Sequence, residues 1–281
     1  MVERFLEGES KIMQVTVLGA NGMLGRYVSK YLSSHPLVDR VSSLVRKDFD
    51  VATVPDSLLR EYLKGANTVI NCAGVIKPRV ESVGIIETIQ VNSIFPHKLA
   101  NMCEKEGINL IHITTDCVFD GWSNSKYSEI NTHNADDLYG RSKSLGEPTN
   151  ATVIRTSIIG EEPGRETSRS LLEWFKSQAG GECNGFSNHH WNGVTCLELA
   201  KLIGSIILNK SYWKGVRHIT SPRSVSKYEL LKLINEVYEL NVKINEVPAA
   251  FPCNRILEST YIKPKTLQLK KQLKELKEFE L

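Results

Sequence analysis

The 281-residue sequence predicts an α/β fold, with a doubly wound parallel sheet and a smaller, interleaved α+β region. Short, continuously apolar runs alternate with helix-like stretches, as expected for parallel strands that are covered on both faces. The first run leads into closely spaced glycines and then into a helical pattern. We place an N-terminal extension at 1–12, the sheet domain at 13–160 with 195–220 returning to it, and the smaller region at 161–194 and 221–281.

The strands and helices can be placed in order along the chain. Five apolar, β-rich runs predict strands at 13–19, 41–46, 67–74, 108–115 and 151–160. Beyond Gly160 the pattern is less regular. There we expect a helix at 168–178, a long loop at 179–193, a helix at 194–208 and a charged amphipathic helix at 266–281 that packs on the body of the protein.

Composition limits the classes of function. Hydrophobic residues make up 41% of the chain, which is enough for a core, and 35 Lys and Arg against 32 Asp and Glu leave no basic excess for nucleic acid or a membrane surface. The six cysteines show no CxxC spacing, so neither a zinc site nor a disulfide framework is expected. The charged N-terminus and the absence of an apolar run of about 20 residues favour a cytoplasmic protein without a membrane span.

The sequence GANGMLG follows the first strand and opens the first helix. Gly19, Gly22 and Gly25 permit a tight turn and a close approach to a pyrophosphate, and the helix start presents N–H groups and its positive dipole end to that anion. We therefore expect a dinucleotide site that also includes Asn21, Met23 and Leu24.

The second strand ends in basic residues where an NAD-specific protein commonly has an acid. Arg46 and Lys47 could pair with a 2′-phosphate, which favours NADPH and leaves NADH as the alternative. Asp50 and Val51 are expected near the adenine.

Several further motifs occur in a fixed order: NCAG (71–74), VNSIFPHKLA (91–100), TTDCVFDG (114–121), DLYGRSKSLGE (137–147), RTSIIG (155–160), SNHHWNGVT (187–195) and SKYELLKL (226–233). With these motifs the chain, from Met13 to about Ser259, resembles the extended short-chain dehydrogenase/reductases, and within them the dTDP-4-dehydrorhamnose reductase group. The resemblance implies a Rossmann domain and NADPH-dependent reduction of the C4 ketone of a nucleotide-linked 4-keto-6-deoxyhexose. The sugar would be of the dTDP-4-dehydrorhamnose or UDP-2-acetamido type, for deoxysugar, polysaccharide or glycan biosynthesis.

One tyrosine and one lysine carry the expected chemistry. At helical spacing i and i+4, Tyr139 and Lys143 share a face, so the ammonium is expected to lower the phenol pKa. The resemblance implies that Tyr139 is the proton donor, that Lys143 also binds the nicotinamide ribose, and that Thr115 polarises the substrate carbonyl.

The resemblance also implies further contacts. Asn71, Cys72, Ala73, Gly74, Asn92, Thr114 and Arg155 are expected at the cofactor, and Val75, Lys77, Asp116, Cys117, Val118, Phe119, Thr156, Ser157, His189, Trp191 and Arg223 at the substrate. The loop with His189 and Trp191 is expected to stack on the base and contact the diphosphate, with Arg165 and Arg169 as further diphosphate candidates.

Two alternatives stay open. Cys117 stands where bifunctional nucleotide-sugar epimerase-reductases resembling GDP-fucose synthase carry an acid/base, so 3,5-epimerisation could accompany reduction, with Lys176 or His189 as second acid/base. The other alternative is a non-catalytic role, because the regulatory subunit of methionine adenosyltransferase resembles the same reductases. The expected partner is the nucleotide sugar, and a homodimer is left open.

Overall fold

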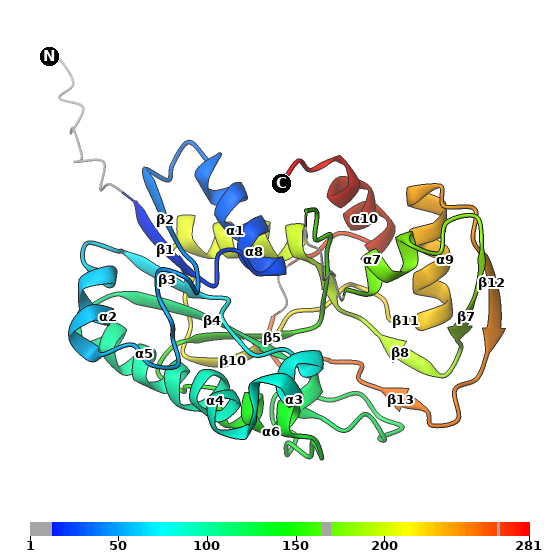
Figure 1. Ribbon diagram of the computed structural model, residues 1–281, viewed down its shortest axis with the longest axis horizontal. Coiled ribbons are helices and arrows are strands. Elements are labelled where there is room, and N and C mark those ends of the chain that lie inside the picture. Colours follow the sequence, from blue (N-terminus) through cyan, green and yellow to red (C-terminus); the bar gives the residue numbers. More distant parts are fainter. Residues whose placement is uncertain (1–12, 165–169, 263–264) are drawn as a thin grey trace, which may run out of the picture.

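The computed structural model describes residues 13–164, 170–262 and 265–281, so the extension expected at 1–12 lies outside the described residues. A six-stranded, fully parallel sheet has the order β10-β5-β4-β3-β1-β2 (Figure 1). Its strands are β1 Gln14–Leu18, β2 Arg40–Leu44, β3 Thr68–Asn71, β4 Asn109–Thr115, β5 Thr152–Thr156 and β10 Gly215–His218. The parallel sheet confirms the predicted fold class. The sequence pattern missed β10 as a strand because it is short and mostly half-buried.

Helices cover both faces of this sheet (Figure 1). α1 (Met23–Ser33) and α8 (Cys196–Leu208) pack on one face, and α2 (Asp56–Leu63) and α5 (Phe95–Lys105) on the other. The short helices α3 (Val80–Val83), α4 (Ile85–Ile89) and α6 (Leu138–Leu145), with a π-helical turn at Gln90–Ile94, flank α5. Burial on both faces explains why the central strands β1 and β3 are mostly apolar.

Within its described residues, the smaller region is built from paired short strands and three helices. β7 (Glu182–Phe186) pairs with β12 (Lys243–Val247), and β6 (Ile158–Ile159) with β9 (Val194–Thr195). β8 (His189–Trp191) lies between β11 (Val225–Ser226) and β13 (Cys253–Asn254). The helices are α7 (Leu171–Lys176), α9 (Lys227–Tyr238) and α10 (Leu269–Glu278).

The sequence expectation of a long loop at 179–193 is wrong, because β7 and β8 lie there. Both are polar and short, and their partner strands come from residues 225–254, so no local periodicity marks them. The expected terminal helix is confirmed: α10 buries Leu269, Leu273 and Leu276 against the main core.

The sheet brings four loops to one edge. From β1 the chain crosses to β2 on one side and then returns to β3 on the other, so the crevice of the doubly wound fold lies beyond the carboxyl ends of β1 and β3. The register pairs Leu18 with Asn71, and Thr115 with Thr156. The segments that follow β1, β3, β4 and β5 therefore emerge at the same edge. None of the helices in the described part of the chain is long and apolar enough to span a membrane.

Candidate active site

The glycine loop after β1 has the tight geometry that a phosphate cradle requires. Gly19 has φ +74°, and a Cβ there would lie 2.8 Å from the Ala73 nitrogen. At Gly25 a Cβ would lie 2.2 Å from the Gly19 carbonyl oxygen, so only glycine lets α1 start this close to the loop. α1 begins after Gly22 without a side-chain cap, which leaves its first N–H groups for an anion.

Helix α6 carries Tyr139 to the end of β4. Asp137 caps its start, accepting a hydrogen bond from the Gly140 nitrogen at 2.7 Å. A Cβ on Gly140 would lie 2.2 Å from the Cys117 carbonyl oxygen, so α6 packs directly on the 3₁₀ turn Asp116–Val118. The half-buried Tyr139 hydroxyl is hydrogen-bonded with Thr115.

Lys143 is buried one turn further along α6. Its Nζ donates to the Ile113 carbonyl at 3.0 Å and faces Gly74, where a Cβ would lie 3.8 Å away. Burial lowers the Lys143 pKa to about 8. Asn92 ties this helix to the loop after β3: its side chain bonds both backbone groups of Val75, at 2.8 and 2.9 Å, and Ser142 at 3.1 Å.

The electrostatics of Tyr139 differ from the sequence expectation. Burial raises the Tyr139 pKa, the neighbouring Cys117 raises it further, and the hydrogen bond with Thr115 only partly opposes them. The Lys143 ammonium donates its hydrogen bond to the Ile113 carbonyl and not to the phenol. The prediction that this ammonium lowers the Tyr139 pKa is therefore wrong in this structure. The phenol therefore keeps its proton at neutral pH.

Arg155 is a correction to the expected cofactor contacts. Its side chain is 1% exposed, and its guanidinium donates to Glu147, to the Nε2 of His218 at 2.8 Å and to the Nε2 of His133 at 2.6 Å. It also lies 5.3 Å from the Phe119 ring centre. Arg155 thus fixes the interior beneath the edge and does not reach a cofactor.

Several expected substrate contacts belong to the core instead. Val118 and Phe119 are fully buried, and Phe119 stacks on Tyr127 at 4.2 Å. Trp191 is buried with its indole nitrogen bonded to Ser157 at 2.8 Å, so its expected stacking on the base is wrong. Thr156 is also buried. The motif residues are hydrophobic or aromatic because they fill the space behind the edge.

The two basic residues after β2 differ in their contacts, because Arg46 forms ion pairs and Lys47 is exposed. Arg46 forms ion pairs with Glu87 and, at 3.6 Å, with Asp50. Asp50 also accepts from the Ala52 nitrogen at 3.0 Å. Lys47 is exposed.

The remaining candidate substrate contacts differ in burial and in their hydrogen bonds and ion pairs. Asp116 is buried and Cys117 half-buried at the edge itself, and Val75 is held by Asn92. Lys77 is exposed and pairs with Asp137 at 2.6 Å. Arg223 is exposed in the segment before β11, whereas Arg165 and Arg169 lie outside the described residues.

Neither expected second acid/base is directed at Cys117. Lys176 pairs with Glu173 and Glu161, at 3.5 and 3.6 Å, and the His189 Nε2 faces the Phe251 carbonyl at 2.9 Å. The charges that act on Cys117 come from Asp116 and from two cations that the sequence analysis did not single out, Arg255 and Lys227. No local signal marks Arg255, since only the pairing of β13 with β8 brings it to the edge.

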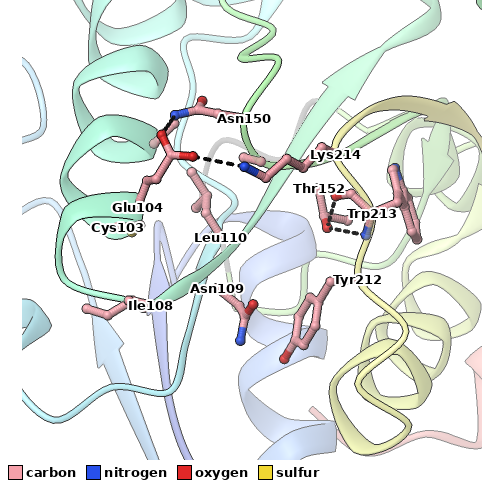
Figure 2. A pocket seen from close by; sticks show the side chains of 13 residues that line it. Cys103, Glu104, Ile108, Asn109, Leu110, Asn150, Thr152, Tyr212, Trp213 and Lys214 are labelled. Carbon is pink, nitrogen blue, oxygen red and sulfur yellow. Dashed lines mark hydrogen bonds and ion pairs between the residues drawn. The ribbon is translucent and has the colours of Figure 1, made fainter.

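A hollow of about 470 Å³ lies at the opposite edge of the sheet, where β4 and β5 begin (Figure 2). Its wall includes Glu104, which accepts from Asn150 at 2.8 Å and from Lys214 at 2.9 Å, and the chain around Trp213. None of the candidate site residues lines it. The candidate site is therefore the edge that carries Thr115, Tyr139 and Lys143.

Comparison with known proteins agrees with this geometry. The family model of the RmlD substrate binding domain matches residues 13–275. The chain belongs to this family. Among its relatives, the dTDP-4-keto-6-deoxy-D-glucose reductase of Streptomyces niveus is 27% identical over 77% of this chain and 76% of that protein. Subunit beta of methionine adenosyltransferase 2 from Bos taurus is 26% identical over 84% of the chain and 76% of the relative. A dTDP-4-dehydrorhamnose reductase of Bacillus anthracis in complex with NADP has the same fold, with a TM-score of 0.79 at 20% identity, covering 94% of this RmlD-type chain and 98% of that one.

Proposed function

We propose that the protein is an oxidoreductase of the short-chain dehydrogenase/reductase class that reduces the C4 ketone of a nucleoside-diphosphate 4-keto-6-deoxyhexose with NADPH, in deoxysugar, polysaccharide or glycan biosynthesis. The observation that carries this proposal is the convergence of Thr115, Tyr139 and Lys143 beside the glycine loop at one sheet edge. The relatives named as dTDP-keto-sugar reductases support the choice of substrate class.

The residues present fit a dinucleotide. Gly19 and Gly25 leave no room for a Cβ, and the uncapped start of α1 offers N–H groups to a pyrophosphate. Lys47 is exposed next to Arg46 and could pair with a 2′-phosphate, as could Arg46 on release from its carboxylates. We therefore propose NADPH and keep NADH as the alternative.

The side chains at the edge have separate roles in this reaction. The hydride comes from the nicotinamide of NADPH when that cofactor is bound. Thr115 donates a hydrogen bond to the ketone oxygen and polarises it, and Tyr139 then gives its proton to the developing alkoxide. Because burial raises the Tyr139 pKa, the phenol is in the protonated form that reduction needs. Lys143 is fixed on the Ile113 carbonyl below Gly74, where it can reach a ribose.

Epimerisation through Cys117 is the second candidate. The Cys117 Sγ lies 3.5 Å from the Asp116 carboxylate. Asp116 directly follows Thr115, the residue proposed to polarise the ketone. Burial and Asp116 together raise the Cys117 pKa to about 12, and Arg255 opposes them only in part. A neutral thiol can return a proton to the sugar but is a poor base, so we place simple reduction ahead of epimerisation.

A regulatory role without catalysis is the third candidate, supported by the relative named as a subunit of methionine adenosyltransferase. For the setting we propose a cytoplasmic protein, since all six cysteines are free thiols, and a homodimer as its assembly.

The test is NADPH oxidation with dTDP- and UDP-linked 4-keto-6-deoxyglucose and the 2-acetamido keto sugar, in D₂O. We expect turnover in the wild type and a loss of about 100-fold or more in Tyr139→Phe, with unchanged NADPH affinity. Deuterium at C3 or C5 that disappears in Cys117→Ala would establish epimerisation. Tight NADPH binding without turnover on any of these sugars would refute the reductase and favour the regulatory role.

A further inference from the structure

Two cations outside the expected site reach the catalytic edge from the smaller region. Lys227 is the first residue of α9 and directly follows β11, and Arg255 directly follows β13. Both strands pair with β8, β11 in the antiparallel and β13 in the parallel sense. The two side chains therefore leave one three-stranded sheet from opposite sides of β8.

Each cation is held against a segment that leaves the edge. The Arg255 Nε and Nη2 donate to the carbonyls of Phe119 and Asp120, at 2.9 and 3.1 Å, in the loop that follows β4. The Lys227 Nζ lies 5.5 Å from the ring centre of Trp191, whose indole nitrogen is bonded to Ser157 just after β5. Residues after β4 and β5 thus position both cations.

The charge of this pair is not cancelled locally. In the described parts of the chain, no carboxylate lies within 4.0 Å of either cation. Asp116 faces both cations; burial raises its pKa and likewise lowers that of Lys227, and the Cys117 thiol is neutral because its pKa is raised to about 12. Among the described residues, two cations thus face a single carboxylate, Asp116, that has no other cation beside it. Asp137 also faces Arg255, but it is paired with Lys77. An excess of positive charge therefore remains beside the candidate catalytic residues.

Donors also remain for an incoming anion. Among the described residues, the Arg255 Nη1 makes no hydrogen bond, and the Lys227 Nζ, which lies over the Trp191 ring, donates none. Both side chains are half-buried, so an anion held between them would be partly removed from water, where charge-assisted bonds are strongest.

We propose that Lys227 and Arg255 form the subsite that holds the diphosphate of the nucleotide-sugar substrate. This inference rests on the proposed function and names the substrate contacts of the same site. The diphosphate is attached to C1 of the sugar, so it must lie a few ångströms from the ring that reaches Thr115 and Tyr139, and both cations act on Asp116 and Cys117 next to those residues. They replace Trp191 in the expected diphosphate contact, since Trp191 is buried.

The experiment measures nucleoside-diphosphate binding directly, by titration calorimetry with dTDP, UDP and GDP in the presence of NADPH. Lys227→Gln and Arg255→Gln are each expected to weaken the Kd of the preferred diphosphate by about tenfold or more, and that of the matching monophosphate less. The control is Lys232→Gln: this exposed lysine lies on the same helix, 5.2 Å from the Tyr228 ring centre. It should bind like the wild type. In turnover assays KM is expected to rise more than kcat falls.

The results separate this inference from the proposed function. Diphosphate binding that weakens in both variants, without turnover on any keto sugar, would support the subsite and refute the reductase. Turnover with an unchanged diphosphate Kd in Lys227→Gln would overturn the subsite and leave the reductase intact. An equal loss in Lys232→Gln, or a wild type that binds none of the three diphosphates, would also overturn it. Lys227→Gln decides if Arg255→Gln fails to fold, because Lys227 donates no hydrogen bond to the described backbone.

Discussion

Removing the negative charge of Glu147 should destabilise the protein strongly. Glu147 and Arg155 form a buried ion pair, with side chains 5% and 1% exposed, in which the carboxylate accepts from two guanidinium nitrogens. The other partners of Arg155 are His133 and His218, whose pKa values are lowered by burial first and by Arg155 next. Both histidines are neutral at neutral pH, so Glu147 is the counter-charge of this guanidinium.

The expected cost follows from this geometry. In Glu147→Gln the amide can keep one hydrogen bond, but the Arg155 charge stays buried without compensation. Breaking one side of a buried pair costs about 3–5 kcal/mol. For a chain of this size each kcal/mol lowers Tm by about 2–4 °C, so a decrease of about 6–20 °C is expected.

Urea unfolding followed by circular dichroism at neutral pH measures this loss. The matched control is Glu104→Gln, which breaks the ion pair with Lys214 at 2.9 Å (Figure 2). These side chains are 50% and 71% exposed, so water screens the pair and the expected loss of stability is small. Equal losses in the two variants, or a loss below about 1 kcal/mol in Glu147→Gln, would refute the reasoning that burial makes the first pair essential.

Three further predictions concern the cofactor loop and two titrating groups. Gly25→Ala should weaken NADPH binding about tenfold or more in a fluorescence titration, because its Cβ would lie 2.2 Å from the Gly19 carbonyl; an unchanged Kd would place the cofactor elsewhere. Burial and Arg155 lower the His218 pKa to about 4, against about 6.5 in the unfolded chain. The unfolded state therefore binds the extra proton first, and the free energy of unfolding should fall by about 3 kcal/mol as the pH drops from 6.5 to 4. Urea titrations over this range in which His218→Gln loses as much stability with falling pH as the wild type would contradict this. The Lys143 pKa is about 8, so kcat/KM for reduction should decline above pH 8, and a flat profile to pH 9.5 would exclude a role for its charge.

The sheet domain was predictable because its signals are local. The central strands β1 and β3 are short apolar runs, and the glycine spacing marks the turn that joins β1 to α1, whereas β10, which is mostly half-buried, gave no such signal. The strands of the smaller region were not predictable in this way. β7 contains Glu182, Asn184 and Gly185, and it becomes a strand only through pairing with β12, some 60 positions later in the chain.

The candidate site divides along the same line. Helical spacing predicted that Tyr139 and Lys143 share α6, and the structure has both there. Spacing could not tell which way the Lys143 ammonium points, because the Ile113 carbonyl that holds it comes from another element. Arg155 and Trp191 stand in motifs that also contain candidate site residues. Only their burial shows that they pack in the interior behind the site.

The pKa values at the edge bear on the direction of the reaction. An acid that protonates an alkoxide must hold its proton at neutral pH, and a phenol prepared for oxidation of an alcohol must instead lose it. In this protein burial and Cys117 raise the Tyr139 pKa, and Lys143 is bonded to a backbone carbonyl with its own pKa lowered to about 8. Both features disfavour a phenolate. The Lys227 and Arg255 charges lie further along the same edge, beside Asp116. There they can attract an anionic substrate without lowering the pKa of the phenol. The arrangement thus separates two tasks, with positive charge where a diphosphate would bind and a neutral acid where the ketone would react, which is the polarity that reduction of a nucleotide-linked ketone requires.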